Sequence, residues 1–372
     1  MARPRILVSL PTKHHVEIAL DEVTGLRELG YPCGSFNYAA KRGYDSKLGR
    51  LIVVFKNAFD LIKLAREFQP DIIYLNSRLE ILAVIRDFLT VGLVKAFYRK
   101  KLYFVIKSHG SDIELLEDRR YLIKKIILPF LKKNISGWLF LSSEEKENIN
   151  AIGYLDREKI FVTKNVVRVG QFEKDPGFKN RNNIPHDHKI LLFVGRIITE
   201  KGIFEVIDAF AKVNLKYRAT LIIVGDGAQF ESVKNRIREK GLTADNVILT
   251  GFIPEKEVVA YYSNADILVF PTFFAEGFPM ALFNAVGAGL AIITTRIRAA
   301  NDFLSEPENC FWVSPKNAGQ VYTKLDELLQ SEALMESMRI NNVQTAKQFS
   351  GSRIAVELGE VFERIIKQRH ND

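Results

Sequence analysis

The 372-residue sequence is longer than one ordinary hydrophobic core requires, and 47% of its residues are hydrophobic, so we expect two folded domains. The chain has neither the ~18-residue apolar run of a membrane-spanning helix nor the apolar stretch of a signal peptide, so we expect a cytoplasmic protein. Cys33 and Cys310 lack the spacing of a metal site or a disulfide, so we expect buried free thiols. The net charge of +9 is confined to residues 1–167, where 28 Lys and Arg face 19 Asp and Glu, which predicts an acidic partner for this half.

Short apolar runs with helical stretches between them recur along the first half and are typical of buried parallel strands. They cover residues 6–10, 72–75, 102–106, 138–141 and 160–162. The loop after the first run carries Lys13, His14 and His15. These side chains could bind an anion, although an ordinary exposed loop explains them equally well.

Two segments of the first half, residues 95–101 and 119–133, mix cations with large apolar and aromatic residues. Such a helix can lie on an anionic bilayer, or its apolar face can pack on the sheet and leave the lysines solvated. We hypothesise a peripheral protein on the inner face of the cytoplasmic membrane, contacting it through Arg99, Lys100, Lys101, Arg119, Arg120, Lys124, Lys125, Lys132 and Lys133. Nucleic acid is not an expected partner, because no recognised nucleic-acid module is present.

A polar passage at residues 171–189 interrupts the alternation, and we interpret it as a linker. Apolar runs resume at residues 191–194, 221–224, 247–249, 267–270 and 291–294. The sequence therefore predicts an α/β protein with two doubly wound, Rossmann-like domains that face each other across a cleft, over residues 1–170 and 188–353. Residues 354–367 predict an amphipathic helix, and we expect the segment 354–372 to pack back on the first domain.

Four turns that follow strands of the second half are candidate ligand sites. The first carries Arg196 and Lys201, which suit a diphosphate as a planar fork and a point charge, although a solvated pair beside a helix is an equal alternative. The second, residues 225–227, favours a tight structural turn. The third, residues 251–253, could wall a nucleobase or be a plain strand exit.

The fourth turn, residues 276–284, is the most informative part of the chain. It places the Glu276 carboxylate at a strand exit, followed by Gly277, which lets the backbone approach a ligand closely. A helix is predicted from Met280, and its free N-terminal amides favour a phosphate. This arrangement predicts a site for a phosphorylated sugar, with Glu276 free to bind sugar hydroxyls.

Taken in order, these turns resemble the nucleotide-sugar-binding half of glycosyltransferase family 4, retaining enzymes with the GT-B fold. The matching stretches are residues 194–196 with 201–202, then 224–227, 250–252, 265–266, 270–271 and 276–279. The resemblance implies the GT-B fold and a metal-independent hexosyltransferase. Its donor would be a UDP- or GDP-sugar, and its acceptor a glycan or lipid-linked glycan in the biosynthesis of cell-surface polysaccharide or glycolipid.

The resemblance also implies roles for single residues. Arg196 and Lys201, assisted by the amides of residues 277–279, would hold the donor diphosphate, and Glu276 would bind hydroxyls of the transferred sugar. His109, in a turn that follows a strand, would place an imidazole near that sugar. The implied catalytic residues are thus Glu276, His109, Arg196 and Lys201, and the implied donor-binding residues are Arg196, Lys201, Gly251, Phe252, Ile253, Glu276, Gly277, Phe278, Pro279 and Asn284.

The sequence departs from the family pattern at two places. Asn284 stands where the family usually has a second glutamate that binds the ribose, so the charge-assisted hydrogen bond is lost. The loop at residues 11–15 replaces a glycine-rich loop of many relatives, and its Lys13, His14 and His15 could meet an anionic acceptor or the donor phosphate. Two other functions therefore stay open: a non-catalytic GT-B partner protein that binds a nucleotide sugar, and a sugar-nucleotide epimerase on the same fold.

Overall fold

The computed structural model describes residues 3–11, 16–38, 43–44 and 46–368, and these form two compact units. The first unit comprises residues 1–166 and 351–372, and the second comprises residues 167–350. Within the described residues, each unit is built on one six-stranded sheet whose strands all pair in parallel. This confirms the predicted fold class of two Rossmann-like α/β domains. No helix of the described part is long and apolar enough to cross a membrane.

The first sheet has the strand order β2-β1-β3-β4-β5-β6. Its strands are β1 Ile6–Leu10, β2 Cys33–Asn37, β3 Ile72–Leu79, β4 Tyr103–Ser111, β5 Ile135–Phe140 and β6 Ile160–Val162. The helices of this unit are α1 Val16–Glu28, α2 Lys47–Phe68, α3 Ile81–Phe97, α4 Leu128–Asn134, α5 Ser143–Ile152 and α14 Gly351–Gln368. A π-helical turn, Ile123–Ile127, leads directly into α4.

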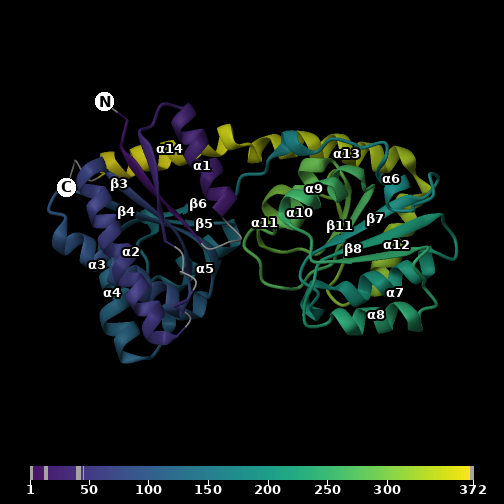
Figure 1. Cartoon of the computed structure of the whole chain (residues 1–372), viewed down its shortest axis with the longest axis horizontal. Coiled ribbons are helices and arrows are strands. Elements are labelled where there is room, and N and C mark those ends of the chain that lie inside the picture. Colours follow the sequence, from purple (N-terminus) through teal and green to yellow (C-terminus); the bar gives the residue numbers. More distant parts are fainter. Residues whose placement is uncertain (1–2, 12–15, 39–42, 45, 369–372) are drawn as a thin grey trace. The chain divides into compact units, whose positions relative to one another are not determined.

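Helices cover both faces of the first sheet (Figure 1). On one face α2, α3 and α4 pack side by side and bury Leu61, Val91 and Leu131 against the strands. On the other face α1 packs along α14, and Leu26 and Phe362 lie in a second core. The last helix of the chain thus belongs to the first unit.

The second sheet has the strand order β12-β11-β10-β7-β8-β9. Its strands are β7 Lys189–Val194, β8 Ala219–Val224, β9 Val247–Gly251, β10 Ile267–Phe270, β11 Ala291–Thr294 and β12 Phe311–Trp312. Its helices are α6 Phe178–Arg181, α7 Ile203–Val213, α8 Phe230–Glu239, α9 Glu255–Asn264, α10 Met280–Ala288, α11 Arg298–Phe303, α12 Ala318–Gln330 and α13 Glu332–Ala346. Helices α7, α8 and α12 lie on one side of this sheet, and α9, α10 and α13 on the other (Figure 1).

The order of the second sheet reverses between β10 and β7, which pair directly. The connections on the two sides of this point run in opposite directions, so the loops that leave these two strands diverge. Open α/β sheets bind ligands at the carboxyl ends of their strands, beside such a switch point. The fold therefore singles out the loops after β7 and β10.

The interpretation of residues 171–189 as a linker is wrong. The segment belongs to the second unit, where it forms α6 and begins β7. Phe178 is buried and packs edge-on against Tyr261 at 5.5 Å, while Phe172 packs edge-on against Tyr262 at 6.1 Å. Isolated aromatic residues hold this polar segment in place. The linker interpretation rests on the lack of apolar periodicity, and single buried aromatic residues do not produce such periodicity.

Both cysteines are buried free thiols, as expected. Cys33 lies in β2 of the first unit, and burial raises the pKa of its thiol to about 12. Burial also raises the pKa of Cys310 in the second unit. These thiols are therefore packing residues, since the thiolate is the reactive form.

Candidate active site

The loops after β7 and β10 bring two of the predicted site residues into contact. Lys201 ends a short 3₁₀ turn, Thr199–Lys201, in front of α7, and Glu276 lies in the loop between β10 and α10. The Lys201 ammonium donates a hydrogen bond to the Glu276 carboxylate and forms an ion pair with it. The carbonyl of Glu200 accepts from the amides of Phe273 at 2.8 Å and Phe274 at 3.0 Å, which fixes one loop against the other.

The two partners of this ion pair differ in exposure. The side chain of Lys201 is 6% exposed, whereas that of Glu276 is 23% exposed. Burial lowers the pKa of Lys201 from its usual value, Glu276 acts in the opposite direction, and Arg196 lowers it further. A buried cation beside a second cation gains from a nearby anion. The site is therefore suited to a strongly negative ligand such as a diphosphate.

Arg196 is exposed and lies close to this pair. Its guanidinium stands 4.8 Å from the ring centre of Phe274, and the Lys201 ammonium stands 5.2 Å from the same ring. Cations are attracted to an aromatic face. The sequence reasoning missed Phe274, because one aromatic residue in a loop carries no signal that distinguishes it from a packing residue.

Glycines allow these loops to pack closely. Gly202 has a positive φ of 75°, and a Cβ at this position would lie 2.4 Å from the carbonyl oxygen of Pro271. Gly225 also has a positive φ, and its Cβ would collide with the carbonyl oxygen of Gly195. The close approach of the loops after β7, β8 and β10 explains why glycine stands at both places.

Helix α10 begins at Met280, with Pro279 as its N-terminal cap residue. The expectation that the amides of residues 277–279 contact the donor is corrected in one respect, because proline has no N–H to donate. The side chain of Phe278 does not face a ligand either. It is buried and stacks on Phe283 with ring centres 3.8 Å apart, so Phe278 can contribute only its backbone.

Asn284 lies on α10, half-buried, and acts electrostatically on the hydroxyl of the buried Tyr262 on α9. Burial raises the pKa of Tyr262, and Asn284 acts in the opposite direction. Glu276 also acts on Tyr262 through its charge. The Asn284 side chain therefore lies near Tyr262, where α10 packs on α9.

The predicted nucleobase wall is at the end of β9. Gly251 has a positive φ of 72° and accepts a hydrogen bond from the amide of Gly225 at 2.9 Å. Phe252 is 72% exposed and Ile253 is half-buried. An exposed phenyl ring at the carboxyl end of a strand offers a face for a planar ligand.

In the first unit, His109 lies within β4, so the expected turn after a strand is wrong. The strand extends to Ser111 because its end still pairs with β3. His109 Nε2 lies 2.8 Å from Oδ1 of Asn76, whose Nδ2 donates to the Ser9 carbonyl at 3.0 Å. Asn76 Oδ1 can only accept, so His109 Nε2 is the donor. The imidazole is thus oriented at the carboxyl ends of β1, β3 and β4.

Lys13, His14 and His15, expected on the acceptor side, lie outside the described residues.

The residues proposed to face a membrane have different environments. Lys132 is paired with Asp156 at 3.4 Å, whereas Lys124 and Lys125 are exposed. Within residues 119–133, the side chains that bury themselves in the first core are Ile123, Ile127, Leu128 and Leu131, so packing on the first domain is correct for these apolar residues.

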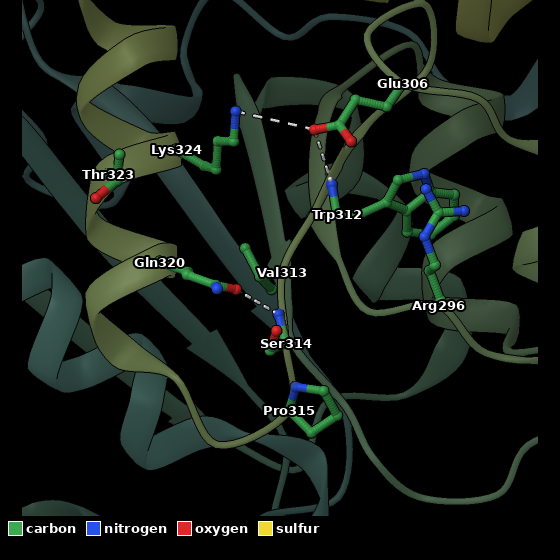
Figure 2. A pocket seen from close by; sticks show the side chains of 9 residues that line it. All are labelled: Arg296, Glu306, Trp312, Val313, Ser314, Pro315, Gln320, Thr323 and Lys324. Carbon is green, nitrogen blue, oxygen red and sulfur yellow. Dashed lines mark hydrogen bonds and ion pairs between the residues drawn. The ribbon is translucent and has the colours of Figure 1, made fainter.

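A hollow of about 650 Å³ lies at the ends of β11 and β12, outside the predicted site (Figure 2). The Arg296 guanidinium stands 4.7 Å from the Trp312 ring. Glu306 accepts from the Trp312 amide at 3.4 Å and pairs with Lys324 at 3.9 Å, as Figure 2 shows. Several polar groups of this hollow bind one another, so they are less available to a ligand than Arg196 is in the predicted site.

Residues 175–345 match the sequence model of a family described as glycosyl transferases group 1. The second unit is a glycosyltransferase group 1 domain.

Two curated relatives align over most of the chain. A capsular polysaccharide biosynthesis glycosyltransferase, CapM, of Staphylococcus aureus is 23% identical over 75% of this chain and 74% of its own. The N,N'-diacetylbacillosaminyl-diphospho-undecaprenol alpha-1,3-N-acetylgalactosaminyltransferase of Campylobacter jejuni is 25% identical over 85% of this chain and 82% of its own. Matches to several further curated relatives span only 49% to 58% of the relative's length.

Among solved structures, that of HepE from Anabaena in complex with UDP and glucose superposes with a TM-score of 0.74. The match covers 97% of this chain and 99% of that chain at 16% identity, so it shows the fold. The chain has the GT-B fold. The glycosyltransferase group 1 domain contains Arg196, Lys201, Phe274 and Glu276, the residues that the loops after β7 and β10 bring together.

Proposed function

We propose that this protein is a retaining glycosyltransferase of family 4, a hexosyltransferase that uses a UDP- or GDP-sugar without a metal ion. One observation carries the proposal: Arg196, Lys201 and Glu276 gather beside the switch point between β7 and β10 of a glycosyltransferase group 1 domain. Two cations and one carboxylate are the groups needed for a diphosphate and sugar hydroxyls.

The proposed chemistry follows from these charges. As the bond between sugar and diphosphate breaks, negative charge grows on the bridging oxygen, and Arg196 and Lys201 stabilise it electrostatically. Their two positive charges take the part that a divalent ion has in other sugar transferases. Glu276 holds hydroxyls of the transferred sugar, and the role of the oriented His109 imidazole of the first unit stays a prediction. In a front-face reaction with retention, the departing phosphate accepts the proton of the acceptor, so no protein base is required.

For the acceptor we propose a glycan or lipid-linked glycan in the biosynthesis of cell-surface polysaccharide or glycolipid. The names of two relatives support this assignment, since one concerns capsular polysaccharide and the other a diphospho-undecaprenol substrate. The excess positive charge of residues 1–167 suits an anionic acceptor or an anionic membrane. We accordingly propose a cytoplasmic protein that works at the inner face of the membrane.

The test begins with thermal stability in the presence of UDP, GDP, ADP or CMP, and then of the matching nucleotide sugars. A ligand at ~100 times its Kd stabilises a protein by about 2.7 kcal/mol. We expect one nucleotide to raise the Tm, and Arg196→Ala to abolish the shift. Arg238→Ala is the matched control, because Arg238 is an exposed arginine on α8 of the same unit.

With the donor known, Arg196→Ala and Lys201→Met should each lower kcat/KM by at least ~10-fold, as the loss of a charged contact of ~1.5–3 kcal/mol predicts. Methionine keeps most of the volume of the buried Lys201 side chain and so limits the loss of stability. Unchanged kinetics in both variants would contradict the assignment of the diphosphate site. A Tm that responds to no nucleotide would contradict the donor class.

A further inference from the structure

Helix α2 is apolar on two opposite sides. Its inward side buries Leu61 and Ala65 in the first core. Its outward side carries Leu48, Ile52, Phe55 and Phe59, which are 69%, 49%, 37% and 51% exposed. The spacing of four, three and four residues places these side chains in one stripe along the helix. A surface helix of a water-soluble domain normally turns a polar face outward, so this stripe needs an explanation.

The exposed apolar residues are concentrated around this stripe. Of the sixteen exposed large hydrophobic residues in the described part of the chain, twelve belong to the first unit. Ten of these lie on α2, on α3 or within residues 121–127 in front of α4: Leu48, Leu51, Ile52, Phe55, Phe59, Leu82, Phe97, Tyr121, Leu122 and Ile126. These elements form the helical layer on one face of the first sheet (Figure 1). Apolar surface gathered in this way marks an interaction site.

A positively charged hollow of about 330 Å³ lies at one end of the stripe. It is lined by Arg66, Phe97, Tyr98, Arg99 and Lys100, and the ring of Phe97 lies 5.9 Å from that of Phe59. Arg66 donates to the Phe97 carbonyl at 3.2 Å, and Lys100 donates to the Gln69 side chain at 2.9 Å. No carboxylate lines the hollow, and within the described residues none of its three cations forms an ion pair. The hollow is therefore suited to phosphate groups.

The charge of the whole layer decides between two occupants of the apolar stripe. Residues 119–133 contain six cations and no acidic residue. Arg120 pairs with Asp118 and Lys132 with Asp156, whereas the exposed Lys124 and Lys125 stand beside the exposed Ile126. A second copy of the chain would bring the same positive surface against this one, and like charges repel. An anionic bilayer offers an apolar interior to the stripe and negative charge to the lysines and arginines.

We propose that the outward face of α2, together with the hollow formed by Arg66, Arg99 and Lys100, docks the protein on a bilayer that contains anionic phospholipid. The stripe side chains enter the boundary between headgroups and acyl chains, and the three cations bind lipid phosphates. This deepens the proposed function by identifying the surface that would bring the enzyme to a lipid-linked acceptor. The docking itself does not depend on donor binding, so the two proposals can fail separately.

The experiment measures co-sedimentation of the full chain with vesicles of phosphatidylcholine alone or mixed in equal parts with phosphatidylglycerol. We expect binding to the mixed vesicles and much weaker binding to phosphatidylcholine. Leu48→Gln/Ile52→Gln should weaken the partition constant at least ~10-fold, because two side chains lose the burial that the bilayer gives. Arg99→Gln/Lys100→Gln should weaken it roughly 30-fold at low salt, at ~1 kcal/mol per cation. Leu215→Gln/Ile340→Gln, which alters two exposed apolar residues of the second unit, is the matched control and should bind as the native chain does.

A tryptophan reporter distinguishes insertion from purely electrostatic adsorption. In Leu48→Trp, the emission should move to shorter wavelength with mixed vesicles, since the indole leaves water. The proposal is overturned if native protein does not bind the mixed vesicles, if Leu48→Gln/Ile52→Gln binds as well as native protein, or if the indole emission stays unchanged. Sedimentation equilibrium covers the alternative: a native dimer that Leu48→Gln/Ile52→Gln converts to a monomer would assign the stripe to a second copy. Nucleotide-induced Tm shifts in the same samples report on donor binding independently.

Discussion

The buried ion pair between Lys107 and Glu22 gives a sharp prediction about the stability of the first unit. Lys107 lies on β4 and Glu22 on α1, both side chains are 0% exposed, and the atoms that bind are 2.6 Å apart. Lys107 also donates to the Lys164 carbonyl at 3.0 Å. Burial lowers the pKa of Lys107 and raises that of Glu22, while each charge acts on the other in the opposite direction. Each partner thus makes the burial of the other tolerable.

Lys107→Met removes one charge and leaves the Glu22 carboxylate buried without its counter-ion. Breaking a buried pair in this way costs ~3–5 kcal/mol, whereas replacing both partners by apolar side chains of similar volume is often neutral or stabilising. We therefore expect Lys107→Met to lower the free energy of unfolding by ~3–5 kcal/mol, and Lys107→Met/Glu22→Leu to restore most of it. The variants differ in charge balance more than in volume, so the recovery would be electrostatic.

The assay is urea unfolding followed by tryptophan fluorescence in a Trp312→Phe background. The chain has two tryptophans, and this substitution leaves the buried Trp138 of β5 to report on the first unit. The loss in Lys107→Met should also shrink as the pH falls from about 7.5 to about 5, because the folded-state pKa of an isolated buried Glu22 lies above its unfolded value and protonation then favours the folded state. A double variant no more stable than Lys107→Met, or a loss independent of pH, would refute this reasoning.

Two further predictions concern the loops after β7 and β10. Gly202→Ala should destabilise the second unit by more than the ~1–2 kcal/mol of a left-handed residue and should abolish nucleotide binding, because its Cβ would collide with Pro271. The control is Gly241→Ala, since Gly241 has a similar positive φ and open space around it. Both variants are compared by urea unfolding and nucleotide titration, and equal effects would contradict the collision. Phe274→Leu should weaken nucleotide binding ~3- to 10-fold, because the aromatic face beside Arg196 and Lys201 contributes ~0.5–1.5 kcal/mol. The measurement is calorimetry, with Phe230→Leu on α8 as the control that should leave the affinity unchanged. An unaltered Kd in Phe274→Leu would contradict the role of the ring.

Most of the strands that the sequence predicts are buried on both faces, whereas the predicted edge strand β9 is largely half-buried. Short runs of Ile, Leu, Val and Phe are typical of a parallel strand covered by helices on both sides, and this pattern locates ten of the twelve strands in the described residues. Strand β2 escapes, because Cys33–Asn37 is an edge strand with two core side chains, Cys33 and Phe36. Its Gly34 is a packing requirement, since a Cβ there would lie 2.9 Å from the Leu7 side chain. Edge position and close packing are set by neighbours distant in sequence.

The candidate site is predictable in its residues but not in their contacts. Arg196, Lys201 and Glu276 each stand at a strand exit, and local sequence identifies such positions. The ion pair between Lys201 and Glu276 spans 75 residues of sequence, and it depends on β10 pairing with β7. That pairing follows from the order of the whole sheet. The share of Phe274 in the site depends on the same pairing, which is why local sequence gave no reason to single it out.

The outward stripe of α2 shows a different limit of sequence reasoning. Residues 48–62 contain so many apolar side chains that helical periodicity predicts burial without saying which side is buried. Only the packed unit shows that Leu61 and Ala65 lie in the core while Leu48, Ile52 and Phe59 stay exposed. A helix buried on one side by its own sheet needs no second apolar side for folding. We therefore expect the outward stripe to make a contact outside the helical layer that carries it, and the cations beside it favour the proposed contact with an anionic membrane surface.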